Sequence, residues 1–167
     1  MNSRRTIIAL ILLVTSINSY SQNYILENEE LIFSFDTKKG KHMVLAKGKM
    51  NEYIIYRFGT KNKIEFEFPN KSKDSWTKFK YSYWLRGGGS SNSGIDLNYI
   101  YFTNKDFRYV VYDTYFSEKE EYSIGIRITN LKTNETISIK GDKRKQKGTL
   151  VDFRENNLLE MGDELFD

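Results

Sequence analysis

The 167-residue chain contains no cysteine. It can therefore form no disulfide, and no lipid can be attached to a cysteine beside a cleavage site. Many small exported domains depend on disulfides for stability, so we expect this chain to be stabilised by its apolar core alone.

Histidine and proline occur once each, as His42 and Pro69. One histidine excludes a multi-histidine metal site, and a Ser-His-Asp triad would have to use His42 without any nucleophile-elbow motif. No cofactor motif is present either, so neither a cofactor nor a metal is predicted. With one proline and no low-complexity linker, the chain shows no domain boundary.

Long hydrophobic runs are also missing. The apolar stretch at residues 7–14 is far shorter than the roughly 20 residues of a membrane span. Arg4 and Arg5 precede it, and Ser19 and Ser21 supply the small residues that a signal peptidase requires. We therefore expect residues 1–21 to be a signal peptide cleaved after Ser21. The mature chain, residues 22–167, would be one periplasmic or secreted domain without a transmembrane segment.

A strong charge of one sign is absent as well. The chain has 26 Lys and Arg against 22 Asp and Glu, and removal of Arg4 and Arg5 with the signal leaves a net charge of +2. Because these charges are scattered, the composition predicts no nucleic-acid binding. The remaining residues are enough for one domain with a single core.

Aromatic and β-branched residues are abundant, and they recur with a period of two. This alternation predicts antiparallel strands separated by short turns that contain Gly, Asn or Asp. The expected fold is all-β, a single-domain antiparallel β-barrel or β-sandwich of about eight or nine strands. The strands are predicted at residues 30–36, 41–46, 52–58, 64–68, 78–86, 94–102, 107–116, 121–131 and 135–140.

The C-terminal residues 156–167 have a different pattern. Leu158, Leu159 and Met161 are spaced as the apolar face of a short helix. We therefore expect a short C-terminal helical segment that docks on the β domain.

The most distinctive segment joins two predicted strands. Its residues are Arg86, Gly87, Gly88, Gly89, Ser90, Ser91 and Asn92, followed by Ser93 and Gly94. Consecutive glycines expose backbone N–H groups and permit positive φ, which suits close approach to a partner. A phosphate-binding loop is excluded, because Gly-x4-Gly-Lys-Ser/Thr at a helix start is missing. The segment is either a flexible connector or a recognition loop on a rigid scaffold.

A second candidate site is a pair of acids, Asp96 and Asp113. If Asn104 and Lys105 form a two-residue hairpin turn, these two residues face each other across the strands, with Cβ atoms roughly 5 Å apart. Facing carboxylates serve acid–base chemistry or bind a cation. The alternative is two solvated acids, because this turn lacks the preferred glycine.

Two weaker features remain open. The basic run at residues 140–147 is either a solvated turn or a contact for an acidic partner or an anionic lipid. The aromatic stripes are either core or a surface that stacks on sugars.

Residues 53–59, the triple glycine, residues 109–113, and Asn130 with Leu131 resemble segments of a group of small exported β proteins of Gram-negative bacteria. That likeness covers most of the mature chain and implies export, but no activity. The overall plan is also similar to that of the periplasmic lysozyme inhibitors, small β-barrels that insert a loop into an active-site cleft. Members of that family commonly carry cysteines and a Ser-Ala-Ser-Gly-type loop, and residues 90–94 match this only loosely.

From these features we expect an exported, non-enzymatic binding protein that acts through the Gly/Ser-rich loop. Its expected partner is another protein of the cell envelope, so that it would serve as an inhibitor or immunity protein against a cell-wall hydrolase or toxin. The alternatives are a hydrolase or metal-binding protein that uses Asp96 and Asp113, and a carbohydrate- or surface-binding module.

Overall fold

The computed structural model describes residues 23–89 and 92–166. The predicted signal peptide, its cleavage site after Ser21, and the loop residues Ser90 and Ser91 lie outside the described residues.

The first half of the chain builds most of a five-stranded antiparallel sheet with the order β10-β1-β2-β3-β4. Short 3-10 helices are labelled η. The helix η1 (Lys49–Asn51) links β2 to β3, and η2 (Lys73–Lys78) follows β4. The strands are β1 (Glu29–Asp36), β2 (Lys41–Gly48), β3 (Ile54–Thr60), β4 (Lys63–Phe68) and the short β10 (Lys147–Gly148).

The second sheet has six strands in the order β11-β5-β6-β7-β8-β9, and only β11 pairs in parallel. The short turns η3 (Lys143–Lys145) and η4 (Val151–Arg154) lie between its last strands. The strands are β5 (Phe79–Arg86), β6 (Ile95–Asn104), β7 (Phe107–Phe116), β8 (Glu121–Asn130), β9 (Thr136–Lys140) and β11 (Glu160–Met161).

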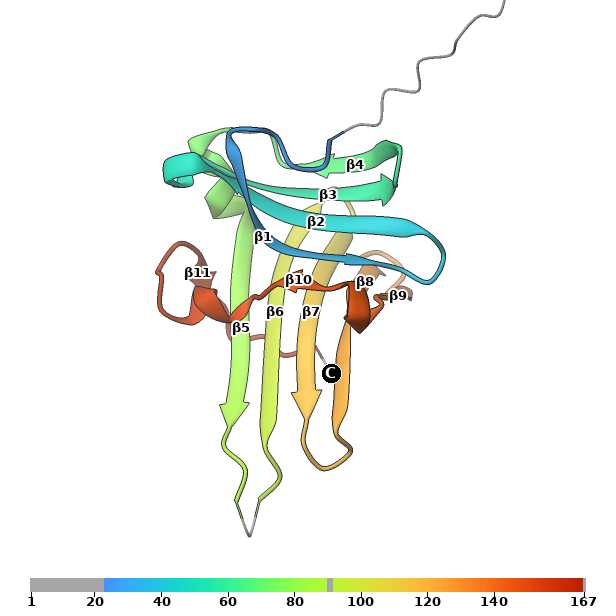
Figure 1. The fold of residues 1–167 in the computed structure, drawn as a ribbon, viewed down its shortest axis with the longest axis vertical. Helices are drawn as coiled ribbons and strands as arrows, with labels where there is room; N and C mark the ends of the chain where they lie inside the picture. The colour runs from blue at the N-terminus through green and yellow to red at the C-terminus, as the bar shows by residue number, and fades with distance from the viewer. Residues whose placement is uncertain (1–22, 90–91, 167) are drawn as a thin grey trace, which may run out of the picture.

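The all-β prediction is confirmed, and each of the nine predicted strands is present within about two residues of its expected ends. The two sheets do not close into a barrel. Figure 1 shows the strands of the first sheet running across those of the second, as in an orthogonal sandwich. The sheets join at one corner, where Thr37 bridges to Gly141 and the Asp142 N–H donates to the Asp36 carbonyl at 2.7 Å.

The main core lies between the sheets. Alternate side chains of each strand point into it, as the period-two pattern requires. The C-terminal segment adds three side chains at the open side. The buried side chains of the main core are Phe33, Phe35, Met43, Leu45, Ile54, Tyr56, Phe79, Tyr81, Ile100, Phe102, Val111, Ile124, Ile126, Leu150, Phe153 and Leu159.

A buried ion pair lies on the outer face of the first sheet, which is the face turned away from the main core. Arg57 on β3 donates to both carboxylate oxygens of Glu29, at 2.5 and 2.7 Å, and to the Tyr24 carbonyl at 2.7 Å. The Arg57 and Glu29 side chains are 1% and 0% exposed. Tyr53 also donates to Glu29, at 3.0 Å, and Glu67 accepts from Arg57 at 2.6 Å. All these groups are paired, which a buried charge requires.

The predicted helix over residues 156–167 is wrong. The described part of this segment is extended, and Glu160–Met161 pairs with Lys80 and Tyr81 as β11. The predicted docking holds for two of its three residues: Leu159 is buried in the core and Leu158 packs against it, whereas Met161 is 49% exposed. Phe166, which was not predicted to dock, packs on Tyr99 and Tyr101. An edge strand offers unpaired backbone groups to an approaching chain, and strand pairing satisfies them.

Candidate functional site

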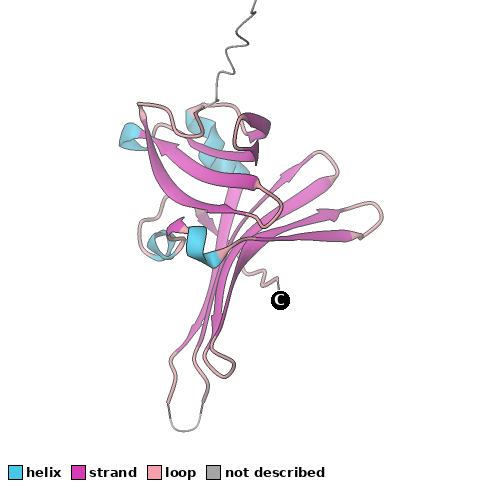
Figure 2. Ribbon diagram, turned by 45° about the vertical axis from the view of Figure 1, so that its right-hand side comes forward, coloured by secondary structure: helices cyan, strands magenta, loops and turns pink. Residues whose placement is uncertain are grey.

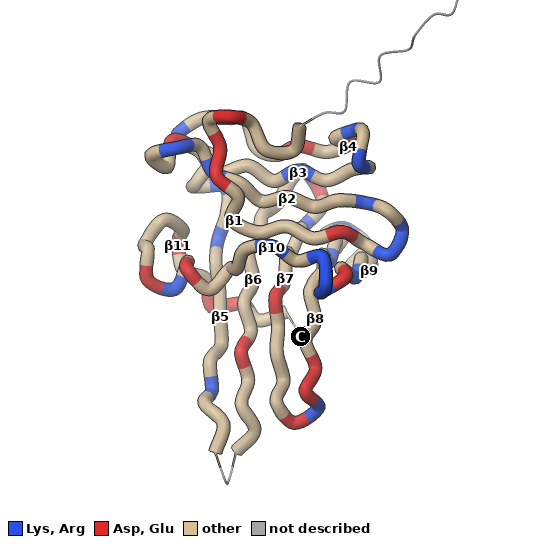
Figure 3. Tube along the Cα trace, viewed as in Figure 1, with Lys and Arg blue, Asp and Glu red and all other residues tan. Residues whose placement is uncertain are grey.

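Strands β5 to β8 extend well past the first sheet. Figures 1 and 2 show their ends, together with the two loops that join them, projecting from the packed body of the molecule. We call this part, the described residues among 83–98 and 113–124, the arm. It carries few charges on its β5 and β6 strands (Figure 3).

The arm exposes large apolar side chains. Phe79 and Tyr81 at the start of β5 are buried, but Trp84 and Leu85 farther along the same strand are 51% and 56% exposed. On β8, Tyr122 is exposed and stacks on Tyr115, with 4.1 Å between ring centroids. Trp84 and Leu85 are successive residues of one strand, so they expose apolar area on opposite faces of the arm, and Tyr122 lies on the face of Leu85. Exposed apolar side chains on both faces of a projecting sheet suit an interaction surface.

The glycine-rich loop forms the far end of the arm. Arg86 Nε donates to the Ser93 carbonyl at 3.0 Å, and Gly89 and Asn92 form a backbone bridge. A side chain added at Gly87 or Gly89 would meet no described atom within 4 Å. Arg86, Gly87, Gly88, Gly89 and Asn92 are all exposed. The described loop therefore adds nothing to the core, and its outward face is free for a partner.

The outer edge of β5 is only partly paired. β11 covers it at Lys80 and Tyr81, and the Gly162 N–H donates to the Tyr81 carbonyl at 2.7 Å. No strand of the described chain pairs with this edge from Tyr83 to Arg86. An unpaired edge that carries Trp84 and Leu85 can accept a strand from another chain.

The predicted facing of Asp96 and Asp113 is wrong. The β6–β7 turn consists of Lys105 and Asp106, so Asp96 lies opposite Tyr115, and Asp113 lies opposite Asn98. The register moves by two residues, which leaves both acids on the same face of the sheet but removes their direct contact.

Each of these acids has a cation as partner. Arg154 contacts Asp96 closely, donates to Asn98 Oδ1 at 2.8 Å, and lies over the Tyr83 ring at 5.0 Å. The buried Tyr81 hydroxyl also donates to Asn98, and burial raises the pKa of Tyr81 to about 12, against the effect of Arg154. These contacts fasten η4 to the base of the arm.

Asp113 is bound by η3 and by the residue that follows η3. Lys143 Nζ lies 3.3 Å from one carboxylate oxygen, and Gln146 Nε2 donates to the other at 3.2 Å. Removal of either acid would therefore break an ion pair rather than relieve a repulsion. In residues 23–89 and 92–166 no group of three or more His, Asp or Glu side chains is placed to hold a metal ion.

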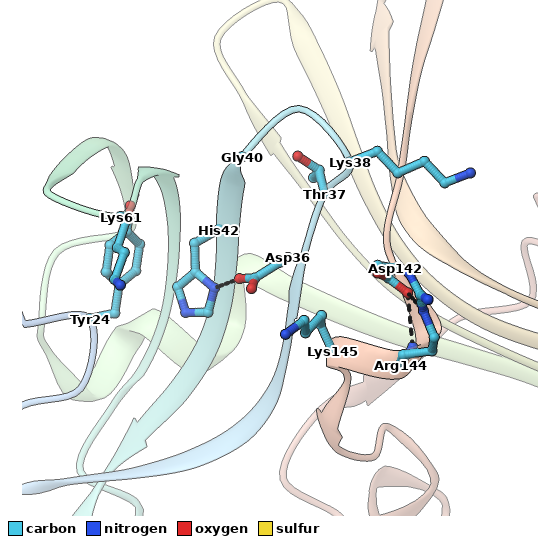
Figure 4. Close-up of a pocket in the computed structure, with 10 residues that line it drawn as sticks. All are labelled: Tyr24, Asp36, Thr37, Lys38, Gly40, His42, Lys61, Asp142, Arg144 and Lys145. Carbon is cyan, nitrogen blue, oxygen red and sulfur yellow. Dashed lines mark hydrogen bonds and ion pairs between the residues drawn. The ribbon is translucent and has the colours of Figure 1, made fainter.

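A second candidate site is an open cleft of about 820 Å³ between the β1–β2 turn, the β3–β4 turn and η3. His42 stands in it, with Nδ1 hydrogen-bonded to Asp36 at 2.6 Å and the Tyr24 ring edge-on at 4.8 Å (Figure 4). The cleft is lined by Tyr24, Asp36, Thr37, Lys38, Gly40, His42, Lys61, Asp142, Arg144 and Lys145.

The sequence did not predict the cleft, although it singled out His42 and the basic run that contribute to it. The sequence showed His42 as a lone histidine and residues 140–147 as a basic run. The β1–β2 turn that contributes Lys38 closes at Gly40, whose φ of 74° favours glycine. Figure 3 shows the basic residues of this turn and of η3 on neighbouring segments. A run of more than 100 residues separates them in the chain, so only the fold brings them together.

Comparisons with models of known protein families, with curated proteins and with solved structures found no match. No helix in the described part of the chain is long and apolar enough to cross a membrane.

Proposed function

We propose that this chain is an exported binding protein without enzymatic activity, and that it contacts another protein of the cell envelope through the arm. The observation that carries this proposal is the exposure of Trp84 and Leu85 on an unpaired strand edge beside the glycine-rich loop. Burial of such a side chain on binding contributes about 1.5–3 kcal/mol. Tryptophan and arginine are also enriched among residues that dominate binding energy, and Arg86 lies two residues from Trp84.

The partner class we propose is a cell-wall hydrolase or toxin, which the chain would inhibit by inserting the end of the arm. A loop that enters a cleft must extend beyond the body that carries it, and the described residues 86–89 and 92–94 lie at such an end (Figure 2). The arm consists of the ends of four neighbouring strands, and β6 and β7 in the middle are hydrogen-bonded on both sides. A rigid support lowers the entropy lost on binding.

Site-specific photocrosslinking in the producing cell tests this proposal. A photoreactive residue at Leu85 or Asn92 should crosslink to a second protein, and the same residue at Thr133, on the β8–β9 turn, should not. The purified chain should then inhibit that protein if it is a hydrolase, and Trp84→Ala should weaken the inhibition by about tenfold, or 1.4 kcal/mol.

Identical products from Leu85 and Thr133 would contradict the assignment of the arm. A product that contains two copies of this chain would show a self-association surface instead.

A further inference from the structure

The cleft beside His42 brings together cations from three separate segments. Lys38 comes from the β1–β2 turn, Lys61 from the β3–β4 turn, and Arg144 and Lys145 from η3. In Figure 4, Lys61 and Lys145 stand on either side of His42. Like charges that line one cleft repel each other, so an anion that binds between them stabilises the arrangement.

Most of these cations have no carboxylate at ion-pair distance. Lys38, Lys61 and Lys145 form no ion pair with any described residue, whereas Arg144 is held by both oxygens of Asp142, at 3.0 and 2.9 Å. Hydrogen bonds from Arg144, helped by the charge of Lys145, lower the pKa of Asp142 to about 2, so this acid is ionised at neutral pH. With Asp36 and Asp142 counted against the four cations, the lining has a net charge of +2 when His42 is neutral.

The wall between the lysines is held in a fixed geometry. The Tyr24 hydroxyl donates to the Thr60 carbonyl at 2.8 Å, which fixes the ring against His42. Asp36 accepts from Nδ1 of His42, so Nε2 is the ring nitrogen left for a ligand. In neutral imidazole this nitrogen accepts a hydrogen bond, and in imidazolium it donates one.

We propose that this cleft binds a small phosphate monoester. Its two negative charges near pH 7 match the net charge of the lining. A carboxylate or a phosphodiester carries only one. The cleft volume falls in the range of small-molecule sites, and the Tyr24 and His42 rings offer an apolar wall for the organic part.

Isothermal titration calorimetry on the full mature chain at constant ionic strength tests the proposal. Phenyl phosphate is the probe, and benzoate, dimethyl phosphate and inorganic phosphate are the comparison ligands. Phenyl phosphate should bind saturably with at least about tenfold higher affinity than benzoate or dimethyl phosphate. Inorganic phosphate should bind more weakly than phenyl phosphate, because it lacks the ring.

Matched variants locate the site. Lys61→Gln with Lys145→Gln should reduce the affinity for phenyl phosphate by at least about tenfold, and Lys119→Gln in the β7–β8 turn should change it by less than about twofold. Asp142→Asn keeps an acceptor for the Arg144 N–H but frees the guanidinium, so it should raise the affinity. Thermal unfolding of each variant shows whether the fold is intact.

Absence of saturable binding at millimolar phenyl phosphate would overturn the proposal. Equal binding of dimethyl phosphate would also overturn it and would indicate a phosphodiester, as in a lipid headgroup or a nucleic acid. Equal losses in the Lys119→Gln control would show general attraction rather than a site. The cleft uses no residue of the arm, so none of these outcomes decides the proposed protein contact.

Discussion

At one end of strands β5 to β8, Tyr81 and Phe102 lie buried beneath the first sheet, and at the other end Trp84 and Leu85 stand in solvent. Both ends belong to the same hydrogen-bonded ladder, with β5 paired to β6 along its whole length. On the β6 side the backbone pairing of the two regions is the same, so they differ in what covers their faces and in the outer edge of β5, which β11 pairs with only at Lys80 and Tyr81.

The geometry of two crossed sheets explains this difference. A ten-residue strand such as β6 is about 33 Å long, whereas five paired strands are only about 19 Å across. Because the first sheet lies across the second, its width covers only part of the length of β5 to β8 (Figure 1). About four residues at the end of each strand extend past this width, which is the length of the arm. Within it Leu97 and Ile124, close to the body, are still buried.

The largest expected effect is at the covered end. Phe102 is 2% exposed and stacks between Phe68 and Tyr109, at centroid distances of 4.6 and 4.9 Å. Phe102→Ala leaves a cavity among rigid rings and should lower the free energy of unfolding by about 3–5 kcal/mol. Urea denaturation measures this value. A loss below about 1 kcal/mol would mean that the sheets are not packed together at this position.

The two ion pairs sharpen the same comparison. Glu29→Gln removes one charge from the buried pair with Arg57 and should cost about 3 kcal/mol at neutral pH. Asp96→Asn, in a pair whose acid is 34% exposed, should cost less than about 1 kcal/mol. Equal costs at the two sites would contradict the difference in burial between the two ion pairs.

The pH dependence of the Glu29 effect has a definite sign. Burial opposes ionisation of Glu29, but hydrogen bonds from Arg57 and from the Leu26 N–H outweigh it, so the pKa of Glu29 lies below its usual value. A lowered pKa stabilises the fold above the unfolded pKa, about 4.3, and this stabilisation is lost as the pH falls through the folded value. The difference between the parent and Glu29→Gln should therefore shrink below about pH 4, in urea denaturation repeated across that range.

The local pattern of the sequence predicted the strands well, and long-range pairing accounts for what it missed. Phe66 and Phe68 face the main core of the structure and Glu67 faces outward, as the alternation predicts. A β-bulge between Ile64 and Phe66 breaks the alternation, so Ile64 packs on the outer face against the cluster that contains Tyr24. Period two is a property of each strand by itself, so no knowledge of its neighbours is needed.

Features that depend on distant contacts were missed. β10 and β11 have two residues each and form only because β1 and β5 present free edges. The acid register failed for a local reason instead: the two-residue turn is Lys105-Asp106 and not Asn104-Lys105, which moves the facing partners by two residues. The arm also depends on distant contacts, because alternation shows which residues share a face of the sheet but not whether a second sheet covers that face.

The smallest expected effect is the most direct test of the uncovered end. Leu85 is 56% exposed, and its cross-strand neighbour is the polar Asp96, so it makes little apolar contact within the described chain. Leu85→Ala should change the free energy of unfolding by at most about 0.5 kcal/mol, as at other surface sites. The matched substitution Leu45→Ala, at a fully buried position of β2, should cost about 2–5 kcal/mol. Urea denaturation of both variants, measured side by side, compares one side chain in two environments. If Leu85→Ala instead costs more than about 2 kcal/mol, this end of the sheet is covered in solution, and Trp84 and Leu85 are not available to a partner.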